Sequence, residues 1–309
     1  MTGKIVVLTG GVGGAKLVLG LAQIVPPADI VAIVNTGDDF RHLGLHVSPD
    51  IDTLLYTLSG KSNQAQGWGR EGESWGFLSA LRSLGGEDWF ALGDGDLALH
   101  VQRSHLLSRG DRLSSITASF AAAWGIEVSI LPMSDDPVAT SLDTDEGKLE
   151  FQRYFVERRC IPVVSRISFP GVETAQPAPG VIEAILQAEA IIIAPSNPYL
   201  SVDPILALPA IAAALHETKA AVVAVSPIIG GKAVKGPTAK LMTELGIRTD
   251  NAAIAAHYKG IVDGLVIDKG DDVPEGLVVE RTDTLMATLD DRARVARVAL
   301  DLARSIGRR

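Results

Sequence analysis

The fold is decided by the stretch Lys4-Ile5-Val6-Val7-Leu8-Thr9-Gly10-Gly11-Val12-Gly13-Gly14-Ala15-Lys16. Its apolar, β-branched start predicts a strand over 4–8, its glycines predict a tight turn, and the spacing that follows predicts a helix over 15–25. A second β-branched run predicts a strand over 30–34. Apolar runs without alternation are typical of parallel strands covered on both faces. The opening therefore predicts an α/β, Rossmann-like doubly wound sheet.

The same order of strand, loop and helix returns in the last part of the chain. The pattern predicts strands over 190–194, 219–225, 260–267 and 277–280, and helices over 203–215, 237–245 and 284–305. Between these parts, residues 52–124 are mostly helical in pattern, and 127–169 resemble short strands with charged turns. We therefore predict a mostly parallel core from residues 1–60 and 180–309, with 61–179 as an inserted helical and mixed cap.

Composition narrows the classes of function. The chain has 309 residues, 47% of them hydrophobic, and a net charge of −9, which argues against nucleic acid as a partner. One cysteine, Cys160, excludes an internal disulfide and a cysteine-based zinc site. The N-terminal apolar run is broken by glycines, unlike a signal peptide, and no run approaches the ~20 residues of a membrane span. We expect a cytoplasmic protein without a membrane partner.

The glycine-rich turn between strand and helix is a candidate phosphate site. Exposed backbone N–H groups and the helix dipole can hold a phosphate there. The candidate substrate-binding residues are Gly10, Gly11, Gly13, Gly14 and Lys16. A P-loop is excluded because Leu17 occupies the position where that motif needs Ser or Thr. A dinucleotide-binding site is opposed because the third glycine of its motif is missing, and so is the acid that would end the second strand. A purely structural tight turn remains the alternative.

Two acidic segments follow the second predicted strand. They are Asn35-Thr36-Gly37-Asp38-Asp39 and Ser48-Pro49-Asp50-Ile51-Asp52-Thr53. Carboxylates beside a phosphate would repel it unless a cation lay between them, and Mg²⁺ binds carboxylate and phosphate oxygens. We therefore predict a magnesium site made by Asp38, Asp39, Asp50 and Asp52. Helix capping by these acids is the alternative.

Loops after two later strands should reach the same edge of the sheet. Ser196-Asn197-Pro198 and Ser226-Pro227 follow the strands predicted to end near 194 and 225, and Lys232 and Lys235 could meet a diphosphate. We expect His42 and His46 to lie in a loop near the acids. His100 and His105 share no helix face, which favours surface or packing roles.

Together these motifs resemble one family. In order, Gly10–Leu17, Asn35–Asp39, Ser48–Thr53, Pro132–Asp135, Pro195–Pro198 and Val225–Ile228 are similar to segments of the 2-phospho-L-lactate transferases (CofD/FbiA). The resemblance covers nearly the whole chain.

The resemblance implies a magnesium-dependent transferase in the biosynthesis of coenzyme F-420. Such enzymes move a phospholactyl-type group (phospholactate, phosphoenolpyruvate or 3-phosphoglycerate) from a guanosine-diphosphate conjugate to the ribityl hydroxyl of the deazaflavin Fo, and GMP leaves. The family's deazaflavin-site acid falls on Asp52. Archaeal members carry a basic residue shortly before Gly93, where this chain has Ala91-Leu92.

Combining the residues with this chemistry assigns roles to the site. Asp50 and Asp52 are the predicted catalytic residues, with Asp52 accepting the hydroxyl proton. The predicted ligands of the diphosphate and guanosine are the glycine turn with Lys16, Asn35, Thr36, Ser196, Asn197, Ser226 and Pro227. No residue decides among the three small acids. A homodimer is a further expectation.

Two other functions compete with this one. A related branch (YvcK-like) consists of non-catalytic regulators that bind nucleotide sugars, but its acid loops differ from those quoted above. An NAD-dependent oxidoreductase is opposed by Asn35 and by the missing third glycine.

The first prediction concerns Asp52. Because phosphoryl transfer depends on positioned charge, Asp52→Asn should reduce turnover by orders of magnitude while the protein stays folded. Steady-state kinetics and circular dichroism measure the two effects. Near-normal activity in this variant would remove Asp52 from the mechanism.

Overall fold

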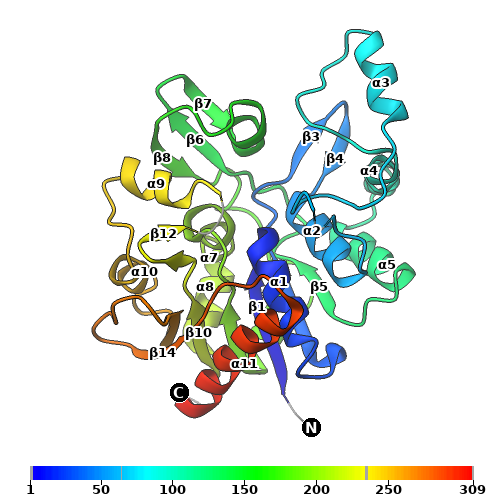
Figure 1. Cartoon of the computed structure of the whole chain (residues 1–309). Helices are drawn as coiled ribbons and strands as arrows, with labels where there is room; N and C mark the ends of the chain where they lie inside the picture. Colours follow the sequence, from blue (N-terminus) through cyan, green and yellow to red (C-terminus); the bar gives the residue numbers. More distant parts are fainter. Residues whose placement is uncertain (1–2, 64, 234–235, 308–309) are drawn as a thin grey trace.

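A parallel sheet forms the centre of the protein (Figure 1). Within residues 3–63, 65–233 and 236–307, which the computed structural model describes, this sheet has seven strands. Their spatial order is β14 (Val278–Thr282), β13 (Gly264–Asp268), β10 (Ala221–Val225), β9 (Ala188–Ile193), β1 (Lys4–Thr9), β2 (Ile30–Val34) and β5 (Ser129–Pro132). Every neighbouring pair runs parallel, which confirms the predicted fold class.

Helices cover both faces of the sheet because the side chains of β1 alternate between two apolar clusters. Ile5 and Val7 belong to one cluster, and Val6 and Leu8 belong to the other. The first face carries α1 (Gly11–Leu21), α2 (Pro49–Leu58), α5 (Leu113–Ala123) and α11 (Leu289–Ile306). The second carries α6 (Val181–Leu186), η3 (Pro198–Val202), α7 (Asp203–Leu206), α8 (Pro209–Glu217), α9 (Thr238–Glu244) and α10 (Asn251–His257).

Further elements lie above the carboxyl ends of the strands, opposite the two termini (Figure 1). One group contains β3 (Phe40–His42), β4 (Leu45–Val47), α3 (Gly76–Ser83) and α4 (Asp94–Ser108). The other contains β6 (Ser141–Thr144), β7 (Gly147–Glu150), β8 (Val164–Ser168) and the π-helical turn η2 (Arg153–Glu157). The remaining elements are η1 (Pro27–Asp29), β11 (Ile228–Ile229) and β12 (Lys232–Ala233).

Several local predictions are corrected by the structure. The first helix begins at Gly11 rather than at residue 15, and the helix expected over 203–215 breaks before Pro209. The sequence pattern missed α10 and the β3–β4 hairpin. Strand β5 lies within the segment 61–179 that we expected to be an insertion, yet it pairs with β2 in the central sheet. That segment therefore supplies part of the core as well as the upper elements.

The first turn of α1 contains glycines because larger residues would not fit there. An added Cβ on Gly13 would lie 2.6 Å from the Pro195 carbonyl oxygen, and one on Gly14 would overlap the Thr9 hydroxyl. Close packing of α1 on the β1 and β9 turns thus outweighs the low helix propensity of glycine.

Within the part of the chain that the structure describes, no single helix is long and apolar enough to cross a membrane. The bent pair η3–α7 and α8 has suitable length and composition, but its side chains Val202, Ile205 and Ile211 lie in the core of this fold.

The second prediction concerns the crossing of α1 and α11. A Cβ on Gly20 would overlap the backbone of Arg292 and lie 3.0 Å from the Ala293 nitrogen. Because backbone cannot move aside cheaply, Gly20→Ala should lower the free energy of unfolding by about 1–3 kcal/mol, as measured by urea denaturation. The exposed control Gln23→Ala should change it by less than about 0.5 kcal/mol. Equal stability of the two variants would contradict this packing.

Candidate active site

The candidate site lies where the strand order reverses. From β1 the chain continues to β2 on one side, while β9 leads to β10 on the other, so the turns after β1 and β9 diverge at a topological switch point. Open α/β sheets bind ligands at this point. The two turns are joined here because the Ser196 hydroxyl donates to the Gly10 carbonyl at 2.7 Å. Ser196 therefore fixes the glycine turn.

The start of α1 is already linked to an acid. The Gly11 N–H donates to Asp50 Oδ1 at 2.7 Å, and Gly11 has a positive φ of 63° that favours glycine. The next amides, those of Val12 and Gly13, also belong to the positive end of the helix, and the N-cap residue Gly10 has no side chain to bind them. The turn thus binds one carboxylate directly and provides helix N-terminal donors for an anion.

Asn35 connects the two acidic segments. Its Nδ2 donates to Asp38 Oδ1 at 3.1 Å and to Asp50 Oδ2 at 2.9 Å, and also lies 3.3 Å from the Leu200 carbonyl. Its Oδ1 accepts the Gly37 N–H at 2.7 Å. Asn35, predicted to bind substrate, therefore organises the acids and ties them to η3.

Burial makes the charged forms of these two carboxylates costly. It raises the pKa of Asp38 well above its usual range, and the neighbouring Asp50 raises it further. Burial also raises the pKa of Asp50 to about 6, against hydrogen bonds from Asn35 and Gly11 that lower it. Two buried carboxylates that share one amide donor repel each other, so a cation between them would be strongly stabilising.

Asp39 follows Asp38 in the chain, and one of its two carboxylate oxygens is bound by polar side chains. Its Oδ2 lies 3.0 Å from His46 Nε2 and accepts the Ser48 hydroxyl at 2.8 Å. Burial raises the pKa of Asp39, while His46 and Ser48 lower it. Among the described residues, buried Asp39 Oδ1 and the Thr36 hydroxyl have no hydrogen-bond partner. Each is a polar group that a ligand could satisfy.

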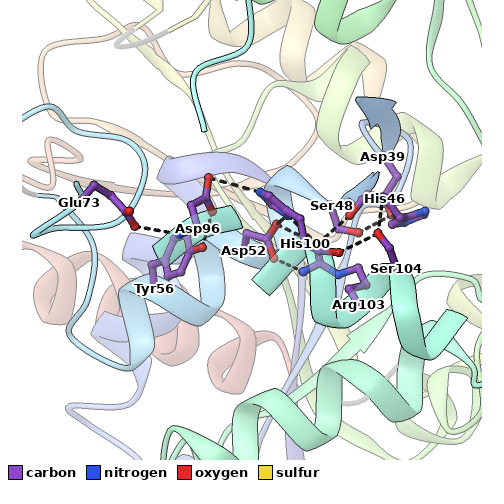
Figure 2. Close-up of polar contacts among 10 residues, drawn as sticks. All are labelled: Asp39, His46, Ser48, Asp52, Tyr56, Glu73, Asp96, His100, Arg103 and Ser104. Atoms are coloured by element: carbon purple, nitrogen blue, oxygen red, sulfur yellow. Dashed lines mark hydrogen bonds and ion pairs between the residues drawn. The ribbon is translucent and has the colours of Figure 1, made fainter. Parts of the chain in front are cut away.

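Asp52 has a different environment from the one we expected (Figure 2). Its Oδ2 accepts from Arg103 Nη1 at 3.1 Å, and its Oδ1 pairs with Arg103 Nη2. His100 Nδ1 lies 3.7 Å from Oδ2. Both oxygens of Asp52 are thus bound by Arg103, a residue of α4, instead of facing the glycine turn alongside Asp50.

The donor set fits a smaller magnesium site than the four-aspartate one predicted. Across 3–63, 65–233 and 236–307, no three His, Cys, Asp or Glu side chains are grouped to hold a metal ion. Mg²⁺, however, commonly takes one or two carboxylates plus phosphate oxygens. Asp38 and Asp50 could supply those carboxylates, and Asp39 Oδ1 is a further unpaired oxygen.

The turn after β9 provides another unsatisfied donor. Asn197 Oδ1 accepts the Tyr199 and Leu200 N–H groups and so starts η3. Its buried Nδ2 has no partner within the described ranges. Asn197 can therefore serve both as the predicted ligand-binding residue and as a helix cap.

The turn after β10 borders a cavity of about 360 Å³. The Ser226 hydroxyl donates to Asn251 Oδ1 at 2.5 Å, and Asn251 Nδ2 donates to Asp271 at 3.1 Å. Asn251 and Asp271 line the cavity, and half-buried Pro227 follows Ser226 in the turn. Ser226 thus supports the cavity wall through Asn251.

The predicted lysines are less closely tied to the acids. Lys16 donates to the Met286 carbonyl at 2.8 Å, in the segment before α11. Lys232 begins β12 and is exposed, and Lys235 lies outside the described residues. Substrate binding by Lys16 stays a prediction.

Sequence reasoning missed the support around the acids. His100, for which the sequence favours a surface or packing role, is only 1% exposed and lies beside Asp52, and no sequence motif marks Arg103. Ser104 accepts the His46 N–H at 2.7 Å. The only available signal was the expectation that His46 lies near the acids, because α4 and the acid loops are far apart in sequence.

Comparisons with known proteins identify the family of the chain. The family described as 2-phospho-L-lactate transferase CofD matches residues 5–303. The chain belongs to the CofD family. This is a family of transferases, as the sequence motifs indicated.

Named relatives in the CofD family span almost the whole chain. A phosphoenolpyruvate transferase of Streptomyces griseus is 43% identical over 98% of this chain and 99% of its own. A 2-phospho-L-lactate transferase of Methanosarcina mazei is 37% identical over 96% and 99%. A solved UPF0052-family structure from Bacillus halodurans has a TM-score of 0.63 at 19% identity, covering 97% of this chain and 100% of its own, and supports the fold alone.

The third prediction follows from the buried Asp50. Since its folded-state pKa of about 6 exceeds the ~4 of an unfolded aspartate, the folded state loses stability as pH rises from about 4 to 6. Asp50→Asn should remove roughly 2–3 kcal/mol of that pH-dependent loss, at about 1.4 kcal/mol per pKa unit. Urea denaturation without divalent cations at several pH values measures it.

The exposed Asp290→Asn is the control and should retain the wild-type pH dependence. Identical pH profiles for wild type and Asp50→Asn would show that Asp50 is not the group that titrates.

Proposed function

We propose that this CofD-family protein transfers a phospholactyl-type group to the ribityl hydroxyl of the deazaflavin Fo in coenzyme F-420 biosynthesis. The group would be phospholactate, phosphoenolpyruvate or 3-phosphoglycerate, carried on a guanosine-diphosphate conjugate, and GMP would leave. The observation that carries the proposal is the junction of buried Asp38 and Asp50 with the N-terminus of α1. This junction pairs anion donors with cation ligands, as a diphosphate–magnesium complex requires.

The names of the relatives support the choice of transferred group. Phosphoenolpyruvate transferases and a 2-phospho-L-lactate transferase both match over nearly their full lengths. The two groups share the phosphate and a neighbouring carboxylate, so one phosphate site serves either of them.

In the proposed reaction the acceptor hydroxyl attacks the phosphorus that carries the small acid. A new P–O bond forms to the ribityl oxygen, the bridging P–O bond of the diphosphate breaks, and GMP leaves with its electron pair. When bound, Mg²⁺ would neutralise charge on the phosphate oxygens and on the leaving group. Asp38 and Asp50 would hold it, with Asp39 as a further oxygen.

Protein groups would position the reactants around this centre. The amides at the start of α1 would bind phosphate oxygens. The Asn197 Nδ2 and the Thr36 hydroxyl, buried and unpaired among the described residues, would donate to the diphosphate or the small acid. A nearby carboxylate would accept the hydroxyl proton. Of the two acids predicted for this role, Asp52 is paired with Arg103, whereas Asp50 accepts from the neutral Gly11 amide and Asn35. The cavity beside Ser226 has the size and polarity to accept a nucleoside.

The proposed enzyme is cytoplasmic and forms a homodimer. A nucleotide donor and a soluble acceptor agree with the localisation, and size-exclusion chromatography with light scattering tests the dimer.

The fourth prediction tests the reaction itself. Purified protein mixed with Fo and Mg²⁺ should yield a product whose mass identifies the added group, together with GMP, for one of the three guanylyl donors. Removal of Mg²⁺ with EDTA should reduce turnover by at least about 100-fold, and its return should restore it. Mass spectrometry measures the product.

Asp50→Asn should lower the same activity strongly, whereas Asp290→Asn should not change it. Binding of a UDP-sugar without any transfer to Fo would support the regulator function instead.

A further inference from the structure

A further cavity, the Arg70 cavity, lies between the segment that follows α2 and the start of α4. It has a volume of about 260 Å³, and its lining includes the indoles of Trp68 and Trp75, which are 54% and 40% exposed. Large aromatic side chains exposed beside a cavity are typical of a site for a planar ligand. The volume lies just below the ~300–1,000 Å³ usual for small-molecule sites, so the cavity suits a part of a ligand.

The charges in this cavity favour a ring over a phosphate. Among the described residues that line it, Arg70 is the one cation, beside the carboxylates of Glu73 and Asp96. One guanidinium against two carboxylates leaves a negative balance, which would repel a diphosphate. Arg70 Nη1 donates to Glu73 at 3.1 Å, and within the described ranges the other nitrogens of Arg70 have no hydrogen-bond partner. These N–H groups suit the carbonyl or hydroxyl oxygens of a neutral ring.

Hydrogen bonds between the two walls hold the cavity in shape. Glu73 accepts the N–H groups of Gly95 at 2.7 Å and of Asp96 at 3.0 Å, at the start of α4. In return, Asp94 accepts the Phe77 N–H at 2.9 Å, at the start of α3. Because the amides at the start of α4 are already bound, that helix end offers no donors to an anion. The cavity is therefore preformed for an uncharged group.

Gly95 gives Arg70 its access to the cavity. A Cβ on Gly95 would lie 1.6 Å from Arg70 Nη1 and 2.9 Å from Glu73 Oε1. Gly95 belongs to the first turn of α4 and does not have a positive φ, so its backbone conformation does not require a glycine. Glycine is also a poor helix former. The feature that accounts for a glycine at this position is the space it leaves for the guanidinium.

The two cavities lie on opposite sides of the buried acids. The cavity beside Ser226 follows β10 and β13, with α10 and β12 on one side of the molecule, whereas the Arg70 cavity adjoins α3 and α4 on the other (Figure 1). In phosphoryl transfer the attacking and leaving oxygens lie roughly in line, so the acceptor and the departing nucleotide occupy opposite sides of the phosphorus. With a nucleoside beside Ser226, the Arg70 cavity is placed for the acceptor.

A path of side chains joins the Arg70 cavity to the acids (Figure 2). Asp96, which lines the cavity, accepts the Tyr56 hydroxyl, and its Oδ2 lies 3.3 Å from His100 Nε2. His100 Nδ1 lies 3.7 Å from Asp52 Oδ2. Tyr56 follows Asp50 by six residues, which is about 9 Å along α2. The ribityl chain of the acceptor separates its ring from the reacting hydroxyl and so provides a spacer for this distance.

We propose that Arg70 is a substrate-binding residue, which donates hydrogen bonds to the aromatic ring system of the acceptor between the indoles of Trp68 and Trp75. Gly95 is the position that admits its guanidinium. The inference rests on the proposed function for the identity of the acceptor, the deazaflavin Fo. Because the ring lies away from the reacting atoms, these contacts contribute to acceptor affinity and not to turnover.

Binding of Fo alone tests this inference without the transfer reaction. The variants are Arg70→Ala, Trp68→Ala and Gly95→Ala, and the matched controls are Arg109→Ala and Leu84→Ala, at exposed positions outside the cavity. Fluorescence anisotropy of the deazaflavin gives the Kd of Fo, and steady-state kinetics give kcat and the KM of each substrate. Urea denaturation shows whether each variant is stably folded.

The fifth prediction is a loss of acceptor affinity alone. Arg70→Ala and Trp68→Ala should each raise the Kd of Fo and the acceptor KM at least about 10-fold, with kcat and the donor KM within about 3-fold of wild type. Gly95→Ala should raise the same Kd and KM at least about 5-fold, because its methyl group displaces the flexible end of Arg70. Since alanine is the better helix former, Gly95→Ala should be no less stable than wild type. Both controls should stay within about 2-fold.

Several outcomes would overturn the inference. An unchanged Kd of Fo in folded Arg70→Ala and Trp68→Ala would do so, while transfer to Fo by the wild type would leave the proposed function intact. A change in the donor KM alone would assign the cavity to the donor. A fall in kcat at unchanged acceptor KM would replace the binding role with a role in turnover.

The wild-type protein separates this inference from the proposed function. Wild type that binds Fo with a Kd dependent on Arg70, yet transfers no group to it, would support the cavity assignment and contradict the proposed reaction. Wild type that neither binds Fo nor transfers a group to it would overturn both.

Discussion

The site depends on the way the Asp50 carboxylate is buried. It accepts the first amide of α1 and the amide of Asn35, and it lies at the point where the strand order of the sheet reverses. Burial raises the pKa of Asp50 to about 6, so the ionised form of this carboxyl group is energetically unfavourable in the folded protein. Such a group is stabilised when a ligand brings a positive charge, and this links the fold to ligand binding.

The glycines of the first turn are needed for the close packing around Asp50, and they contribute to phosphate binding only indirectly. A Cβ at Gly10 would lie 2.5 Å from Asp50 Oδ2 and 2.7 Å from Ser201 Cβ, and one at Gly13 would meet the Pro195 carbonyl. The turn is thus built from residues small enough to let α1, α2 and η3 converge. The convergence also places the start of α1, whose first amides have no partner within the helix, at this edge of the sheet.

The elements above the sheet support the acidic loops, and no motif in their sequence indicates this role. Helix α4 contacts the acid loops through an ion pair from Arg103 and a hydrogen bond to Ser104, and His100 links Asp52 to the Asp96 side chain at 3.3 Å. The pKa of Asp96 is lowered despite its burial, because His100 and Tyr56 bond to it. A helix above the central sheet therefore holds residues of both acidic segments in position.

The sequence by itself determined the parallel sheet, because the β-branched runs at 4–8 and 30–34 are local signals that need no tertiary partner. It also determined the family and the order of the acidic and glycine-rich motifs. Only the tertiary structure decided which acids act together. Gly11 and Asp50 are 39 residues apart, and Asp52 and Arg103 are 51 apart, so no local pattern links them. Such pairs form when packed helices bring side chains within hydrogen-bond distance, and this geometry separated Asp52 from Asp38 and Asp50.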